Sequence, residues 1–177
     1  LAAAILMLAG YTGEEILYDP CAGSGTILIE AALIATHTAP GFLRRNFGFT
    51  SLPGFKEESF LKVKGEIDSQ RIPLQKGTIF GSDINKTAVQ ICKLNLRAAG
   101  FLQTIEVVQG DLKEIIPPIT PNLCVTNPPY GRRLNDDLDY LKTLYRAIGA
   151  FLKKKKKKPA KGFVLTGNLT LAKEVGL

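Results

Sequence analysis

The sequence predicts an α/β domain built on a mostly parallel β-sheet with helices on both of its faces. Three observations support this prediction. Short apolar runs typical of buried strands alternate with segments of helical periodicity along the chain. The first of these runs is followed by a glycine turn and an apolar helix, which is the opening unit of a nucleotide-cofactor fold. Polar residues stand directly after four of the predicted strands.

The opening unit begins with an apolar run at residues 16–18, which predicts the first strand. The strand ends before Pro20, because proline has no N–H for a strand ladder. Gly23 and Gly25 then let the backbone approach a ligand closely. The dinucleotide fingerprint has a third glycine where this chain has Leu28, and the P-loop pattern is absent. The turn therefore favours an adenosine cofactor without phosphates.

The other elements follow in alternating order around an irregular region at 37–77, which is rich in glycine and proline. Further strands are predicted at 76–83, 104–109, 122–126 and 162–166, and helices at 1–9, 27–35, 56–68, 86–99 and 141–152. We expect Asn85 to cap the helix at 86–99, and Asp136 or Asp137 to cap the helix at 141–152.

The charge of the chain is concentrated in one place. The 177 residues fit one domain, and the formal net charge is +7. Residues 153–158 are six consecutive lysines, and without them 17 basic residues face 16 acidic ones. The lysine run favours a solvated loop at a helix end, and contact with phosphates is the alternative.

Cysteine usage indicates a reduced compartment. Cys21, Cys92 and Cys124 are far apart and the chain has one histidine, which excludes a zinc site of the C-x-x-C kind and a disulfide framework. We therefore expect a cytoplasmic protein without a metal. No apolar run has the length of a membrane span, so no membrane association is expected. The chain starts inside a helical pattern without methionine, and we expect a fragment of a longer protein.

Polar residues at the strand ends predict a binding site. Asp19, Asp83, Asp111 and Asn127 each follow an apolar strand. In an open parallel sheet the ligand lies beyond the carboxyl ends of the strands. We expect Asp83 to accept hydrogen bonds from both ribose hydroxyls. Asp111 and Leu112 are expected to border the adenine. Each acid alone could be a turn residue or a helix cap, and it is the regular series that predicts a site.

The most specific motif is Asn127-Pro128-Pro129-Tyr130. Its two prolines leave few N–H groups, so carbonyl oxygens and the asparagine amide present a row of acceptors. Acceptors that bind both hydrogens of a planar NH₂ group favour its pyramidal, nucleophilic form, and Tyr130 can stack on the attached ring. The alternative is a proline turn that merely ends a strand.

Taken together, these motifs resemble class I S-adenosylmethionine-dependent methyltransferases that act on exocyclic amino groups. The resemblance rests on D-P-C-A-G-S-G-T from Asp19, G-S-D-I-N from Gly81, G-D at Gly110 and N-P-P-Y-G from Asn127. Segments 30–42, 127–134 and 165–168 are similar, more closely, to the THUMP-associated RNA guanine-N2 methyltransferases of large-subunit rRNA. Members of that family often carry the label N6-adenine-specific DNA methylase.

The resemblance covers nearly the whole chain and carries several expectations. It implies a Rossmann-like class I methyltransferase fold from which the strands after the fifth are missing. It implies one catalytic domain over residues 1–177, with an irregular insertion at 37–77. A THUMP-type RNA-binding module is expected in the parent chain, with large-subunit rRNA as the partner. Arg132 stands where relatives usually have an acid, which alters the charge beside the target pocket.

The motifs and the resemblance together define the predicted site. The catalytic residues are Asn127, Pro128, Pro129 and Tyr130. The cofactor, S-adenosylmethionine, is expected to be held by Asp19, Cys21, Ala22, Gly23, Gly25, Thr26, Asp83, Ile84, Asp111, Leu112 and Asn127. Arg132 and Arg133 are expected to bind substrate phosphates.

The expected reaction is methylation of an exocyclic amino group of a nucleic-acid base, with guanine N2 in rRNA as the target. Such a base must leave its stack to enter the pocket. The N-P-P-Y chemistry also serves adenine-N6 methylation of DNA and methylation of a protein glutamine amide, and both stay open. A fourth reading is a non-catalytic scaffold that binds the cofactor and associates with RNA.

Overall fold

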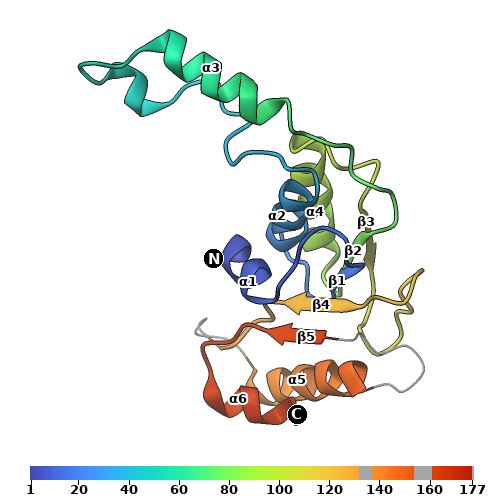
Figure 1. Cartoon of the computed structure of the whole chain (residues 1–177). Coiled ribbons are helices and arrows are strands. Elements are labelled where there is room, and N and C mark those ends of the chain that lie inside the picture. Colours follow the sequence, from blue (N-terminus) through green and yellow to red (C-terminus); the bar gives the residue numbers. More distant parts are fainter. Residues whose placement is uncertain (132–136, 154–160, 177) are drawn as a thin grey trace.

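The computed structural model describes residues 1–131, 137–153 and 161–176, and its core is a five-stranded parallel sheet (Figure 1). The strands lie in the order β3-β2-β1-β4-β5. They are β1 (Leu17–Asp19), β2 (Ile79–Asp83), β3 (Glu106–Gln109), β4 (Leu123–Thr126) and β5 (Lys161–Val164). The order reverses between β1 and β4, which is the place where open α/β sheets bind ligands. The predicted α/β fold class is confirmed.

The two faces of the sheet carry different helices. Successive side chains of a strand point to opposite faces, and the two buried neighbours Leu17 and Tyr18 of β1 illustrate this. Leu17 belongs to a core cluster with α1 (Ala2–Leu8), α2 (Thr26–Ala35) and α4 (Lys86–Ala98). Tyr18 belongs to a second cluster with α5 (Leu138–Lys153) and α6 (Leu169–Glu174). Figure 1 shows these two helix groups on either side of the strands.

Side-chain caps fix where two helices begin. Asn85 Oδ1 accepts hydrogen bonds from the N–H groups of Thr87 at 2.8 Å and Ala88 at 3.2 Å, which confirms the predicted cap of α4. Asp137 Oδ1 accepts from the N–H groups of Asp139 at 2.9 Å and Tyr140 at 3.3 Å, so Asp137 caps α5. The other predicted candidate, Asp136, lies outside the described residues.

The irregular region at 37–77, here called the arm, projects from the sheet in Figure 1. It contains a 3₁₀ helix, η1 (Gly48–Ser51), and the helix α3 (Glu57–Asp68) that the sequence predicts. Four phenylalanines pack against one another with ring centroids 5.1 to 5.9 Å apart, and they are Phe47, Phe49, Phe55 and Phe60. The arm therefore has a small apolar centre of its own.

The base of the arm is tied to the end of α2. The Ile72 N–H donates to the Thr36 carbonyl oxygen at 3.0 Å, and Arg71 Nε donates to Thr38 Oγ1 at 3.1 Å. The Arg71 guanidinium also lies over the Phe42 ring, 3.6 Å from its centroid. Because the arm joins the end of α2 to the start of β2, it leaves the sheet at the edge opposite the carboxyl ends of the strands. None of the helices in the described ranges is long and apolar enough to cross a membrane.

Candidate active site

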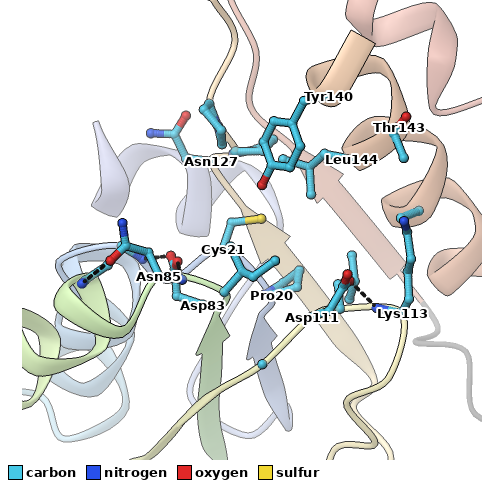
Figure 2. Close-up of a pocket in the computed structure, with 18 of the residues that line it drawn as sticks. Pro20, Cys21, Asp83, Asn85, Asp111, Lys113, Asn127, Tyr140, Thr143 and Leu144 are labelled. Carbon is cyan, nitrogen blue, oxygen red and sulfur yellow. Dashed lines mark hydrogen bonds between the residues drawn. The ribbon is translucent and has the colours of Figure 1, made fainter. Parts of the chain in front are cut away.

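A cleft of about 600 Å³ opens at the carboxyl ends of the strands (Figure 2). Its wall brings together ten of the predicted site residues from the ends of four strands. These residues are Cys21, Gly23, Asp83, Ile84, Asp111, Leu112, Asn127, Pro128, Pro129 and Tyr130. In Figure 2, Asn127 lies on one side of the cleft, Asp83 and Asp111 lie on the other, and Cys21 lies between them.

Four other residues predicted to hold the cofactor lie behind this wall, at the end of β1, in the glycine turn and at the start of α2. Asp19 and Ala22 are buried under the turn. Gly25 is the N-cap of α2, and Thr26 is the first residue of that helix and is exposed. These residues shape the turn rather than line the cleft.

The two positions of the turn are glycine for different structural reasons. Both have a positive φ, 53° at Gly23 and 85° at Gly25. A Cβ at Gly25 would lie 2.5 Å from Cys92 Sγ, so this position must be glycine for the turn to pack on α4. A Cβ at Gly23 would meet nothing closer than the Cys21 carbonyl oxygen at 4.0 Å. Gly23 therefore leaves its backbone open to the cleft.

The carboxylate of Asp83 holds the end of β2 against the glycine turn. Its Oδ2 accepts from the Gly23 N–H and its Oδ1 from the Asn85 N–H, each at 2.9 Å. A carboxylate has about four lone-pair sites, so each oxygen can accept one bond more. Asp83 can therefore bind a pair of hydroxyls without giving up its hold on the turn.

Asp111 occupies the equivalent place after β3. Its Oδ1 accepts from the Lys113 N–H at 2.9 Å, which closes a tight turn, and the neighbouring Leu112 is buried. The Gly110 N–H donates to the Asp83 carbonyl oxygen at 3.0 Å. The ends of β2 and β3 are thus joined, and two carboxylates lie along one side of the cleft.

Asp19 is buried, with 1% of its surface exposed, and it is bound from two sides. Its Oδ1 accepts from Thr126 Oγ1 at 2.7 Å and from the Cys21 N–H at 3.0 Å. Burial raises the pKa of Asp19 to about 7, and the carboxylate of Asp83 adds to the rise. Burial also raises the pKa of the Cys21 thiol well above its usual value. Cys21 therefore stays a thiol at neutral pH.

The N-P-P-Y turn follows β4 directly and forms the other side of the cleft. Pro128 is buried, whereas Asn127 and Pro129 are exposed at the cleft. Tyr130 is half-buried and packs against the core cluster that contains Tyr18. A proline-stiffened turn thereby brings an amide and an aromatic ring to the same cleft, and both groups suit a flat, nitrogen-bearing ligand.

The cleft also contains residues that were not among the predicted site residues. They are Pro20, Asn85, Ala88, Gly110, Lys113, Tyr140, Thr143, Leu144 and Ala147. The last four stand at i, i+3, i+4 and i+7 on α5 and so form one face of that helix. This helical spacing is the signal in the sequence that groups these four residues on one face. The sequence shows an amphipathic helix there, but not that one flank of it reaches the cleft.

Tyr140 is the most prominent of these residues. Figure 2 shows its ring over the cleft, on the same side as Asn127 and Leu144 and facing Cys21. Partial burial raises the pKa of its hydroxyl, and the nearby Cys21, Asp111 and Asp83 add to the rise. The hydroxyl therefore stays protonated at neutral pH and is available as a donor at the mouth of the cleft.

Some predicted positions fall outside the described part of the chain. Arg132 and Arg133, predicted to bind phosphates, lie there, as do residues 154–158 of the lysine run. Within the described part, no three His, Cys, Asp or Glu side chains gather in a way that could hold a metal ion.

Comparisons with known proteins show the family of the chain. Residues 1–175 match the UPF0020 family, described as RMKL-like, methyltransferase domain. The ribosomal RNA large subunit methyltransferase K/L of Psychromonas ingrahamii is 39% identical over 158 residues, which cover 86% of this chain and 21% of that protein. This chain thus spans about a fifth of the length of that relative.

Two solved structures share the fold over nearly the whole chain. SMU.472, labelled a methyltransferase and complexed with SAH, matches with a TM-score of 0.85 and 31% identity. A chain from Listeria monocytogenes labelled N6-adenine-specific DNA methylase matches with a TM-score of 0.84 and 29% identity. Each match covers 99% of this chain and 45% of the other. The chain belongs to the UPF0020 family and contains its RMKL-like methyltransferase domain.

Proposed function

We propose that this domain is an S-adenosylmethionine-dependent N-methyltransferase that modifies guanine N2 in large-subunit rRNA. The observation that carries the proposal is that the glycine turn, two strand-end carboxylates and the N-P-P-Y turn line a single cleft. Names of relatives support the RNA part, since the Psychromonas ingrahamii protein is a ribosomal RNA large subunit methyltransferase K/L. The proposal includes a THUMP-type RNA-binding module elsewhere in the full protein and a cytoplasmic location, where rRNA is available.

The residues present fit an adenosine-type cofactor. The cleft has a volume within the range of about 300–1,000 Å³ that is usual for small-molecule sites. In the proposed arrangement Asp83 accepts from the ribose hydroxyls, and Asp111 with Leu112 binds the adenine edge. The open backbone at Gly23 and the Cys21 thiol face the part of the cofactor beyond its adenosine. The complex of SMU.472 with SAH, the demethylated product, supports this cofactor class.

The cofactor, when bound, supplies a methyl group on a cationic sulfonium. The residues of this chain then have to bring the target nitrogen into line with that group, because positioning supplies much of the rate of such a displacement. In the proposal the Asn127 amide oxygen and the neighbouring backbone carbonyl accept hydrogen bonds from the two amine hydrogens. Tyr130 stacks on the base. The nitrogen would bond to the methyl carbon as the carbon–sulfur bond breaks with its electron pair left on sulfur, so that SAH would leave and the extra proton on nitrogen would pass to solvent.

A second candidate function is methylation of adenine N6 in DNA. The label of the Listeria monocytogenes structure favours it, and an exocyclic amine on adenine suits the same Asn127 and Tyr130. The relatives named as rRNA methyltransferases are more similar in sequence than that structure, at 39% against 29% identity. Ribosomal RNA is therefore the first choice of substrate, and guanine N2 as the target atom stays part of the proposal.

The test is transfer of a radiolabelled methyl group by the complete protein to rRNA, DNA and protein in parallel, followed by nucleoside analysis. We expect label in large-subunit rRNA, recovered as N2-methylguanosine. Label recovered as N6-methyladenine in DNA would establish the second candidate instead. Label in none of the three acceptors, with a folded protein that binds SAH, would leave only a non-catalytic role.

A further inference from the structure

The strands β1 and β4 separate before they reach the cleft. Their ladder pairs Leu17 with Leu123 and Tyr18 with Cys124, and goes no further. One residue on, Asp19 pairs with Gly81 of β2, while β4 continues along β5. Because Pro20 has no N–H, it cannot extend the ladder. The backbone therefore opens a gap between the glycine turn and the N-P-P-Y turn.

A side-chain hydrogen bond crosses this gap. Thr126 Oγ1 donates to Asp19 Oδ1 at 2.7 Å, and both residues are buried, at 0% and 1% exposure. The same oxygen accepts from the Cys21 N–H at 3.0 Å. A hydrogen bond to a carboxylate in a buried setting is among the stronger ones in proteins. One oxygen atom therefore binds both the end of β4 and the start of the glycine turn.

The position of Thr126 in the chain explains how this hydrogen bond affects the N-P-P-Y turn. Thr126 is the last residue of β4 and directly precedes Asn127. On its other side it is held by β5, because the Leu165 N–H donates to the Thr126 carbonyl oxygen at 2.9 Å. The side chain thus decides how far Asn127 stands from the glycine turn, while the backbone bond to β5 stays the same.

We propose that Thr126 is a positioning residue that sets the distance between the glycine turn and the N-P-P-Y turn by anchoring β4 to Asp19. The inference rests on the proposed function, because it takes Asn127 to hold the target amine and the glycine turn to hold the cofactor. Loss of the anchor lets the two turns drift apart, and a misplacement of about 1 Å can lower a rate about 100-fold.

Three variants of the complete protein test the role. Thr126→Val keeps the shape of the side chain and removes its hydroxyl, and Thr126→Ser restores the hydroxyl. Thr36→Val is the matched control. Thr36 is equally buried, and its Oγ1 donates to the Ala32 carbonyl oxygen at 2.7 Å, but it lies at the far end of α2. Thr126→Ala replaces the valine variant if the latter does not fold.

The first measurement is kcat for rRNA together with the dissociation constant of SAH. We expect Thr126→Val to lower kcat by about tenfold or more while SAH affinity changes by less than about threefold. Thr126→Ser restores kcat, and Thr36→Val leaves it unchanged although it lowers the melting temperature. A purely structural role predicts instead that both valine variants lose stability and keep kcat, and that result would overturn the inference.

The second measurement does not need methyl transfer. Hydrogen exchange of the backbone amides in segment 126–131 reports on how firmly the N-P-P-Y turn is held. We expect faster exchange there in Thr126→Val than in the wild type and in Thr126→Ser, with SAH bound. Unchanged exchange contradicts the anchor. A wild-type protein that methylates no rRNA contradicts the proposed function, and the exchange result still decides the anchor.

Discussion

The backbone N–H of Gly23 donates a hydrogen bond of 2.9 Å to Oδ2 of Asp83. This bond joins two turns that are 60 residues apart in the sequence. It makes Asp83 both a support of the glycine turn and a part of the cleft wall. The same carboxylate also accepts from the Asn85 N–H, so its orientation is fixed before a ligand arrives.

The first prediction concerns this carboxylate. Asp83→Ala removes the acceptor for the ribose hydroxyls and a partner of the Gly23 N–H. A hydrogen bond to a charged group contributes about 1.5–3 kcal/mol, so SAH affinity should fall about tenfold to 150-fold. Isothermal titration calorimetry measures the change. Asp139→Ala is the control, because Asp139 is an exposed carboxylate outside the cleft wall. Unchanged affinity in Asp83→Ala would remove Asp83 from the cofactor site.

The second prediction concerns Asp111 and the adenine amine. Asp111→Ala should weaken binding of SAH more than binding of an analogue that carries a carbonyl in place of the exocyclic amine. The reason is that the carboxylate can accept from an amine but only repels a carbonyl oxygen. Competition binding of the two ligands to wild type and variant gives the comparison. Equal preference in both proteins contradicts the assignment.

The third prediction concerns the packing of the glycine turn. Gly25→Ala places a Cβ 2.5 Å from Cys92 Sγ at a φ of 85°. A non-glycine residue in this region costs on the order of 1–3 kcal/mol, and the overlap adds to it. Urea unfolding should show that loss. Measured against Cys92→Ala as the reference, Gly25→Ala should cost less, because the overlap with Sγ is gone and only the strain of the positive φ remains. Gly48→Ala is the control, since a Cβ there meets nothing within 4 Å.

Much of the site could be predicted because it depends on local chemistry and one topological rule. Asp83, Asp111 and Asn127 stand at strand ends, and parallel strands bring those ends to one edge. Gly23 and Gly25 follow from the need for positive φ in the turn. None of these inferences requires knowledge of how distant helices pack.

The parts that were missed depend on such packing. Tyr140 and Leu144 lie on the flank of α5 between the core face and the solvent, and they line the cleft because of where α5 packs against the sheet. The bond from Thr126 Oγ1 to Asp19 Oδ1 spans 107 residues and depends on how β1 and β4 lie in the sheet, whereas the role of Asp19 toward the cofactor stays a prediction. The helix α6 has six residues, too few for periodicity to show.

The fourth prediction follows from the raised pKa of Asp19. Its pKa is about 7 in the folded protein against 3.8 for the ordinary side chain, so the folded state holds a proton that the unfolded state has lost between these values. Stability should therefore fall as pH rises from about 4 to about 7 and level off above that range. Asp19→Asn removes this dependence, because the amide does not titrate.

The measurement is urea unfolding of wild type and Asp19→Asn at pH 5, 6, 7 and 8. The free energy of unfolding of the variant should gain on that of the wild type as pH rises, at up to about 1.4 kcal/mol for each pH step below the pKa. Parallel curves for the two proteins would show that Asp19 titrates far from neutrality in the folded state.

The last prediction separates amine activation from cofactor binding. In Asn127→Ala the target amine loses the side-chain acceptor that holds it in line with the methyl group, while the glycine turn, Asp83 and Asp111 are unaltered. We expect kcat to fall about 100-fold or more, as for the loss of other groups that act in a transition state, and SAH affinity to change by less than about threefold.

Asn122→Ala is the matched control, because Asn122 is exposed at the start of β4 and far from the N-P-P-Y turn. Radiolabelled methyl transfer to rRNA at saturating substrate, with calorimetry for SAH, gives both numbers. Normal methyl transfer by Asn127→Ala would refute the proposed chemistry, because the proposal assigns the side-chain acceptor of the target amine to Asn127 and only base stacking to Tyr130.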